Sequence, residues 1–293
     1  MKKQTYTHTV DEVVKAELNF TVYGEGAPKV FFTGGIHGGE ATGIYVAQRV
    51  MQFIEEHGLE KGTLKVLPIS NPTAFRRLQR TSPYDELDMN RIFPGREDSA
   101  PTLGVANVIW QEAQDQDYIV DLHCCGVHGA SYTLAIYNEY DCAKDLAAML
   151  SIPRIIESGG TRGQLFVNAC DKGIPAVIIE LPGGGQGGVI DLDAAEECYQ
   201  ALINLLRQLG MVKGEAIKPT PTFYGKLQPV QSKVDGVFLP AVKVGEPIKE
   251  GQVLGTVNGE AILSPVTGTT TAVRPASYVF KGNSLANVAP LAE

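Results

Sequence analysis

Two histidines and a glutamate have the residue types and the spacing of metal ligands. His37 and Glu40 stand three residues apart in a glycine-rich stretch that follows a short apolar run, and His123 directly follows another apolar run, residues 118–122. Two imidazoles and one carboxylate are a usual ligand set for a catalytic Zn²⁺, with one coordination position left for water. The spacing alone also fits two polar histidines at the starts of loops, so both interpretations stay open at this level.

A further carboxylate, Glu180, ends the apolar run 176–179 and precedes the glycine-rich segment 182–185. Removal from water disfavours the charged form of a carboxylate, so a partly buried glutamate here should have a raised pKa. A raised pKa would suit Glu180 to act as a general base near neutral pH. The alternative interpretation is a charge at the start of a flexible loop.

Arginines are concentrated between residues 76 and 91, although the formal net charge of the chain is −8. The four are Arg76, Arg77, Arg80 and Arg91. A guanidinium offers a fixed fork of donors to carboxylates and a positive charge for a developing oxyanion. In an acidic chain, this density favours an anion-binding site over a solvated basic loop.

Alternating apolar runs and helix-period segments must position these side chains. Strands are predicted at residues 30–33, 64–69, 118–122, 132–136, 154–156 and 176–181, and helices at 41–56, 104–114, 143–150 and 193–209. Nearly continuous apolar strands that alternate with helices indicate an α/β fold whose mostly parallel sheet is covered on both faces. Ligands of open α/β sheets bind at the carboxyl ends of the strands, where His37, His123 and Glu180 would meet.

The last quarter of the chain has a different pattern of apolar residues, glycine and proline. Residues 218–222 read Lys-Pro-Thr-Pro-Thr, which is typical of a linker, and the residues after them form short β-like pieces separated by glycine and proline. We therefore expect a catalytic α/β domain over residues 1–217 and a β module over residues 218–293. The residues before 28 suggest an N-terminal strand or hairpin outside the main alternation.

Composition excludes several classes of protein. The 293 residues carry 25 basic and 33 acidic side chains without a basic run, which is unfavourable for binding nucleic acid or an anionic membrane. No apolar stretch approaches the roughly 20 residues that span a bilayer, and no signal peptide is visible. Five cysteines, two of them adjacent, do not fit a disulfide framework, so we expect a cytoplasmic protein.

Five short motifs together resemble the succinylglutamate desuccinylase/aspartoacylase family, a branch of the zinc carboxypeptidase-like hydrolases. In chain order they are Gly35-Ile-His-Gly-Gly-Glu40, Asn71-Pro with Arg80 nine residues on, Asp88-Met-Asn-Arg-Ile-Phe-Pro-Gly95, Asp121-Leu-His123 and Ile179-Glu180. They follow the order of the family over roughly residues 28 to 190. The resemblance implies a zinc-carboxypeptidase-like mixed, mostly parallel sheet flanked by helices, followed by an all-β module.

The resemblance also implies roles for single residues. His37, Glu40 and His123 would hold one Zn²⁺ per chain, and Glu180 would be the general base for the water that the metal activates. Arg80 would polarise the scissile carbonyl and stabilise the oxyanion.

On the same resemblance, Asn90 and Arg91 would hold the carboxylate of the substrate, with Asp88 orienting that pair. Arg162 lies in a suitable loop for reading the acyl group. Tyr224 and Tyr278 are candidates for a tyrosine that enters the site from the β module, although a packed tyrosine is the simpler interpretation of each.

The C-terminal module has a resemblance of its own. Residues 245–255 and 264–268 resemble the barrel-sandwich module of biotinyl and lipoyl carriers, but the stretch 256–263 that would carry the modified lysine contains none. We therefore expect this module to narrow the mouth of the site or to form an oligomer interface.

The implied function is a zinc-dependent deacylase that cleaves the amide bond of a small anionic N-acyl amino acid or related compound. A homo-oligomer is the common default for such an enzyme. One alternative is a metallocarboxypeptidase acting on peptides, which would share the site but whose access the β module should restrict. The other is an inactive small-molecule-binding protein, against which the retained ligands, Glu180 and Arg80 argue.

Overall fold

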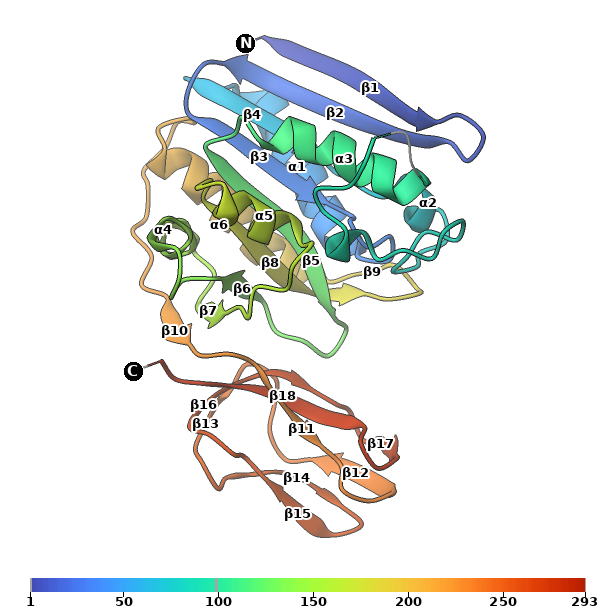
Figure 1. The fold of residues 1–293 in the computed structure, drawn as a ribbon. Coiled ribbons are helices and arrows are strands. Elements are labelled where there is room, and N and C mark those ends of the chain that lie inside the picture. The colour runs from blue at the N-terminus through green and yellow to red at the C-terminus, as the bar shows by residue number, and fades with distance from the viewer. Residues whose placement is uncertain (1, 98–99, 293) are drawn as a thin grey trace.

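A ten-stranded sheet forms the centre of the protein, as a computed structural model of residues 2–97 and 100–292 shows (Figure 1). Its strands are β1 (Lys3–Asp11), β2 (Ala16–Glu25), β3 (Lys29–Gly34), β4 (Gly62–Leu67), β5 (Tyr118–Gly126), β6 (Tyr132–Ala135), β7 (Arg154–Glu157), β8 (Ala176–Gly184), β9 (Val189–Ile190) and β10 (Thr222–Tyr224). The order is β1-β2-β4-β3-β5-β8-β6-β7-β10, with β9 paired to β8. All six strands expected from the apolar runs are present, and the expected N-terminal hairpin is β1 and β2.

Strand direction divides the sheet into a parallel centre and antiparallel additions. The pairs β4–β3, β3–β5, β5–β8, β6–β7 and β7–β10 are parallel, whereas the pairs β1–β2, β2–β4, β8–β6 and β8–β9 are antiparallel. The predicted mixed, mostly parallel sheet is therefore confirmed. The parallel centre brings the carboxyl ends of β3, β5 and β8 to one edge of the sheet.

Helices cover both faces of this sheet. The helices are α1 (Ala41–His57), α2 (Pro72–Phe75), α3 (Pro101–Ala113), α4 (Asp141–Met149), α5 (Leu165–Asp171) and α6 (Leu192–Gln208), with a 3-10 turn η1 (Met89–Arg91). Buried residues of α1, α4 and α6 share one core, and those of α3 and α5 share a second core on the opposite face. No described helix is both long enough and apolar enough to cross a membrane.

Alternation along β5 decides which side chains face which core. Val120 and Leu122 pack in the core beneath α1, α4 and α6, whereas Ile119 packs in the core beneath α3 and α5. Successive side chains of a strand point to opposite faces of the sheet. Asp121 and His123 therefore project on the side of Ile119, toward α3 and α5.

The C-terminal module contains two antiparallel four-stranded sheets, seen below the main sheet in Figure 1. Its strands are β11 (Gln228–Gln231), β12 (Gly236–Pro240), β13 (Pro247–Ile248), β14 (Val253–Val257), β15 (Glu260–Leu263), β16 (Gly268–Val273), β17 (Ser277–Val279) and β18 (Ser284–Pro290). The orders are β11-β18-β16-β13 and β15-β14-β12-β17. Small apolar clusters around Phe238 and Val288 form its interior.

The module joins the main sheet through backbone pairing. Strand β10 lies beyond the expected domain boundary at residue 217, yet it pairs in parallel with β7 of the main sheet. Between β5 and β6, the loop 128–130 pairs with β16: Ala130 N–H donates to the carbonyl of Thr271 (2.9 Å), and Val273 N–H donates to that of His128 (3.2 Å). The second part of the chain thus contacts the loop that follows His123.

A buried ion pair under the N-terminal hairpin should contribute to stability. Lys65 on β4 is 8% exposed, and its ammonium donates to the carboxylate of Glu112 on α3 (2.6 Å), which also accepts from the Tyr6 hydroxyl (2.7 Å). Burial alone would raise the pKa of Glu112, but hydrogen bonds from Lys65 and Tyr6 hold it below its usual range. The stabilisation is therefore full above the unfolded-state pKa of about 4.3 and is lost as the pH falls through the lower folded-state pKa.

Lys65→Met is accordingly expected to lower the free energy of unfolding at pH 7 by about 1–3 kcal/mol, because it leaves the carboxylate of Glu112 without its cation. Urea unfolding at pH 7 and in acid measures this, and the deficit should shrink in acid. Lys29→Met is the control, since Lys29 pairs with Asp115 at the exposed surface and should cost about 1 kcal/mol or less. Equal losses in the two variants would contradict the assignment.

Candidate metal centre and active site

The turn between β3 and α1 carries the first two predicted ligands. The chain leaves β3 through Gly35, which has a φ of +64°, and Glu40 is the N-cap residue of α1. Between them, the N–H of Gly38 donates to the carbonyl of Gln79 (2.8 Å). A Cβ atom added to Gly38 would lie 2.1 Å from the backbone carbon of Ala74, so only glycine lets this turn pack against α2.

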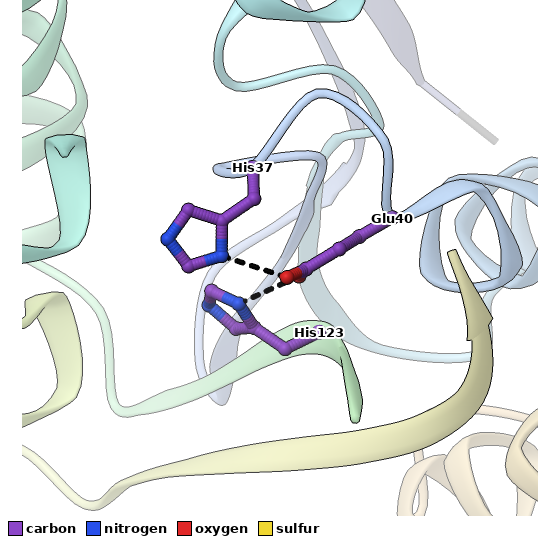
Figure 2. A group of neighbouring side chains, drawn as sticks. All are labelled: His37, Glu40 and His123. Atoms are coloured by element: carbon purple, nitrogen blue, oxygen red, sulfur yellow. Dashed lines mark hydrogen bonds and ion pairs between the residues drawn. The ribbon is translucent and has the colours of Figure 1, made fainter. Parts of the chain in front are cut away.

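His37, Glu40 and His123 converge on one point (Figure 2). Nδ1 of His37 lies 2.8 Å from Oε1 of Glu40, and Nδ1 of His123 lies 2.9 Å from Oε2 of the same carboxylate. One ligand atom from each residue lies within 4.8 Å of the others, and all three residues are buried. The structure thus brings together the three side chains that the sequence predicts as metal ligands.

Carboxylates hold the far nitrogens of both imidazoles. Nε2 of His37 lies 3.0 Å from Oδ1 of Asp88, and Nε2 of His123 lies 2.9 Å from Oδ2 of Asp121. A carboxylate on one ring nitrogen fixes the tautomer and orientation of a histidine that binds metal through the other. Both Nδ1 atoms are therefore set to face the same point as Glu40.

Electrostatics favour a cation at this point. Although burial opposes it, the two imidazoles hold the pKa of Glu40 at about 2, and Asp121 and Glu40 raise the pKa of His123 well above its usual value. Buried carboxylates around two histidines stabilise positive charge, and two imidazole nitrogens with one carboxylate oxygen form a ligand set that suits Zn²⁺. The residues therefore fit a divalent metal ion.

Asp121 is a positioning residue whose role the sequence did not assign, although strand alternation places it on the same side as His123 two residues later. Asp121→Asn should lower zinc affinity about 10–100-fold, because the neutral amide no longer raises the basicity of the imidazole. Competition with a fluorescent chelator measures this affinity. Thr133→Val is the control, since its buried hydroxyl has no hydrogen-bond partner among the described residues. Unchanged affinity in Asp121→Asn would contradict the role.

Glu180 lies beside this cluster on the neighbouring strand. The register of β5 and β8 pairs His123 with Glu180, and Glu180 is the one residue of β8 that is not fully buried. Burial raises the pKa of Glu180 to about 7; the positive charge of His123 opposes this rise and the negative charge of Glu40 adds to it. A carboxylate with this pKa can both accept and return a proton near neutral pH.

Arg80 reaches the cluster through Asp88. Its Nε and Nη2 atoms each lie 2.9 Å from Oδ2 of Asp88, whose other oxygen contacts His37. The third guanidinium nitrogen, Nη1, lies 3.4 Å from Nδ1 of His37. Asp88 therefore ties the orientation of Arg80 to that of His37, and Nη1 is the guanidinium atom that contacts the cluster.

The remaining predicted residues lie further out. Asn90 is buried: its side-chain oxygen accepts from the N–H of Leu165 (3.2 Å), and its Nδ2 lies 3.4 Å from Nε2 of His123. Arg91 is exposed and donates to the carbonyl of Asn90 (2.7 Å). Arg162 is also exposed, and the adjacent Gly163 packs against the backbone of Arg91. The backbone segments that carry Arg91 and Arg162 thus lie in contact with each other. The roles of the two side chains in substrate binding stay predictions.

A cavity of about 750 Å³ adjoins the cluster, and sequence reasoning missed most of its wall. Besides His37, Glu40 and Arg80, its lining includes Leu78, Gln79, Glu86 and Gln186. Gly183 at the end of β8 and Gly185 just after it also line the cavity, which the glycine-rich segment 182–185 could have indicated. Arg91, Arg162, Tyr224 and Tyr278 do not line it, and the Tyr278 side chain is exposed on the β module.

Comparison with known proteins agrees with these observations. The sequence model of the succinylglutamate desuccinylase/aspartoacylase catalytic domain matches residues 26–209. The N-alpha-acetyl-L-2,4-diaminobutyric acid deacetylase of Halomonas elongata is 30% identical over 248 residues, which cover 80% of this chain and 71% of that protein.

Solved structures share the fold along nearly the whole chain. An aspartoacylase family protein of Mesorhizobium loti has a TM-score of 0.81 at 23% identity, with 100% of this chain and 95% of that one covered. The product-bound ectoine utilization protein EutE (DoeB) of Ruegeria pomeroyi has a TM-score of 0.80 at 23% identity, with 98% and 93% covered. On the match to its catalytic domain and the similarity to the deacetylase, the chain belongs to the succinylglutamate desuccinylase/aspartoacylase family.

Proposed function

We propose that the chain is a zinc-dependent deacylase that hydrolyses the amide bond of a small N-acyl amino acid or related N-acyl compound. The observation that carries the proposal is the convergence of His37, Glu40 and His123 beside Glu180, in a chain of this family. The deacetylase of Halomonas elongata makes an N-acetyl amino acid the first substrate to try.

His37, Glu40 and His123 would hold the metal ion. When bound, the ion supplies a Lewis acid that lowers the pKa of a water molecule and polarises a carbonyl oxygen. The Asp88 and Asp121 carboxylates keep the imidazoles in the orientation that this role needs.

The other residues of the site would handle protons and charge. Glu180 takes the proton of the attacking water and returns it to the nitrogen of the leaving amine, for which its pKa of about 7 is suited. The guanidinium of Arg80 stabilises the negative charge that develops on the carbonyl oxygen. Asn90 and Arg91 are proposed to fix the carboxylate of a small anionic substrate, which orients the amide relative to Glu180.

A substrate screen tests the proposal. Purified protein loaded with zinc is offered N-acetyl, N-succinyl and N-formyl amino acids, and release of the free amine is followed, with bound metal counted by elemental analysis. Hydrolysis of at least one compound, lost on chelation and restored by zinc, is the expected result. Stoichiometric zinc without hydrolysis of any compound would reject the deacylase.

Two other functions have distinct outcomes in the same experiment. A metallocarboxypeptidase would release the C-terminal residue of peptides and leave the N-acyl amino acids intact. An inactive binding protein would bind no zinc and would hydrolyse nothing after zinc is added.

A further inference from the structure

One exposed residue that lines the cavity, Glu86, carries a charge that the proposed chemistry does not use. Outside the predicted ligands, the charged side chains that line the cavity are Arg80 and Glu86. The charge of Arg80 is balanced by Asp88, through two contacts of 2.9 Å. Among the described residues, no cationic side chain lies within ion-pair distance of Glu86. Glu86 therefore presents one negative charge without a cationic partner to whatever occupies the cavity.

The backbone holds Glu86 in place, because the turn that carries it is built into the fold. The N–H of Glu86 donates to the carbonyl of Ser82 (2.9 Å), and Ser82 is buried. The neighbouring carboxylate of Asp85 accepts from both the N–H and the hydroxyl of Thr102 on α3 (2.9 and 2.8 Å). These bonds attach the turn to a helix of the main domain, so the backbone that carries the exposed Glu86 side chain has a defined position.

The backbone conformation of Glu86 also supports a role for this residue at the cavity. Its φ is +54°, in the left-handed region that favours glycine and costs other residues about 1–2 kcal/mol. Such conformations persist where the surroundings enforce them and occur often at ligand-binding sites. At this position glycine would adopt the positive φ at a lower free-energy cost, yet the chain has a glutamate, whose carboxylate lies at the cavity wall.

We propose that Glu86 is a specificity residue that binds a protonated amine on the amino-acid part of the substrate. The substrate class would be N-acyl diamino acids, acylated on the α-amine and carrying an ammonium group on the side chain. A carboxylate at the wall of a partly enclosed cavity attracts such a group and disfavours an acidic side chain at the same place. This inference rests on the proposed deacylase function for its substrates, and it concerns a residue outside the proposed catalytic set.

Matched substrates test the role of Glu86. N-α-acetyl-L-2,4-diaminobutyrate and N-acetyl-L-2-aminobutyrate share a carbon skeleton and differ in the ammonium group. The zinc-loaded protein should prefer the first by about tenfold or more in kcat/KM. Glu86→Gln should abolish most of this preference by raising KM for the diamino compound, with kcat held and with little change for the aminobutyrate compound.

Two further variants separate recognition from structure. Glu250→Gln removes an exposed carboxylate of the β module and should keep the preference for the ammonium group. Glu86→Lys should reverse the preference, so that N-acetyl-L-glutamate becomes a better substrate than the diamino compound. Equal losses of kcat/KM on both matched substrates in Glu86→Gln would mean that Glu86 only shapes the turn. An unchanged preference for the diamino compound would mean that Glu86 does not contact the ammonium group. Either result overturns the proposal.

A binding measurement keeps this inference separate from the proposed activity. Calorimetry compares L-2,4-diaminobutyrate with L-2-aminobutyrate, both without an acyl group, on the zinc-loaded wild type and on Glu86→Gln. Tighter binding of the diamino compound that Glu86→Gln removes would support the role even if no N-acyl compound were hydrolysed. Equal affinities of the wild type for the two compounds would overturn it whether or not the protein is a deacylase.

Discussion

Glu180→Gln is expected to lower kcat by about 10²–10⁴-fold while the protein still binds one zinc ion. Glutamine has nearly the same shape as glutamate but cannot accept a proton from water at neutral pH. The metal cluster itself involves His37, Glu40 and His123, so zinc affinity should change little. Steady-state kinetics on the best N-acyl substrate, with elemental analysis of bound zinc, measure both quantities.

The control for this variant is a second glutamate at a strand end. Glu157 ends β7, is buried, and accepts hydrogen bonds from the backbone N–H groups of Tyr137 and Asn138. Burial raises its pKa as well, yet it lies outside the cluster. Glu157→Gln should therefore keep its activity. If Glu180→Gln turned over substrate at the wild-type rate, another group would have to be the base.

Gly38→Ala is expected to weaken zinc binding by at least about tenfold and to lower the free energy of unfolding by about 1–3 kcal/mol. The added methyl group would overlap the backbone of Ala74 and Phe75, at distances of 2.1–2.3 Å. Backbone atoms of α2 cannot move aside cheaply, so the turn must shift and separate His37 from Glu40. Zinc competition and urea unfolding measure the two effects.

Gly187→Ala is the matched control. This glycine lies in another glycine-rich turn near the cavity, the one that follows β8. The nearest atom to its added Cβ would be Cγ2 of Val189 at 3.6 Å, an ordinary van der Waals contact. Its zinc affinity should equal that of the wild type. Full zinc affinity in Gly38→Ala would show that the turn can move without disturbing the ligands.

The central part of the site could be predicted because local sequence and sheet geometry agree there. Apolar runs mark buried strands, parallel strands end at the same edge, and polar residues just after those ends must therefore come together. This reasoning led to His37, His123 and Glu180, and the structure places them side by side. The strands and the four longer helices were predictable for the same reason, since their apolar periodicity extends over enough residues to be recognised.

Other parts depend on contacts that no local pattern reports. Helix α5 has only seven residues, too few for periodicity to separate it from a loop. The wall that contains Leu78 and Glu86 is irregular chain held by hydrogen bonds to α3 and to the turn after β3. Strand β10 lies directly after a segment with the composition of a linker, and only its pairing with β7 shows that it continues the main sheet.

The short ladder between β16 and the loop 128–130 has a thermodynamic consequence. This loop continues the strand that carries His123, so moving the β module away would leave the N–H of Ala130 and the carbonyl of His128 unpaired. Any ligand that binds at His123 and requires this loop to be ordered must then also favour the docked module. By linkage, the docked module strengthens binding of that ligand by the same coupling free energy. The module, although it contributes no metal ligand among the described residues, would thereby set part of the affinity of the site.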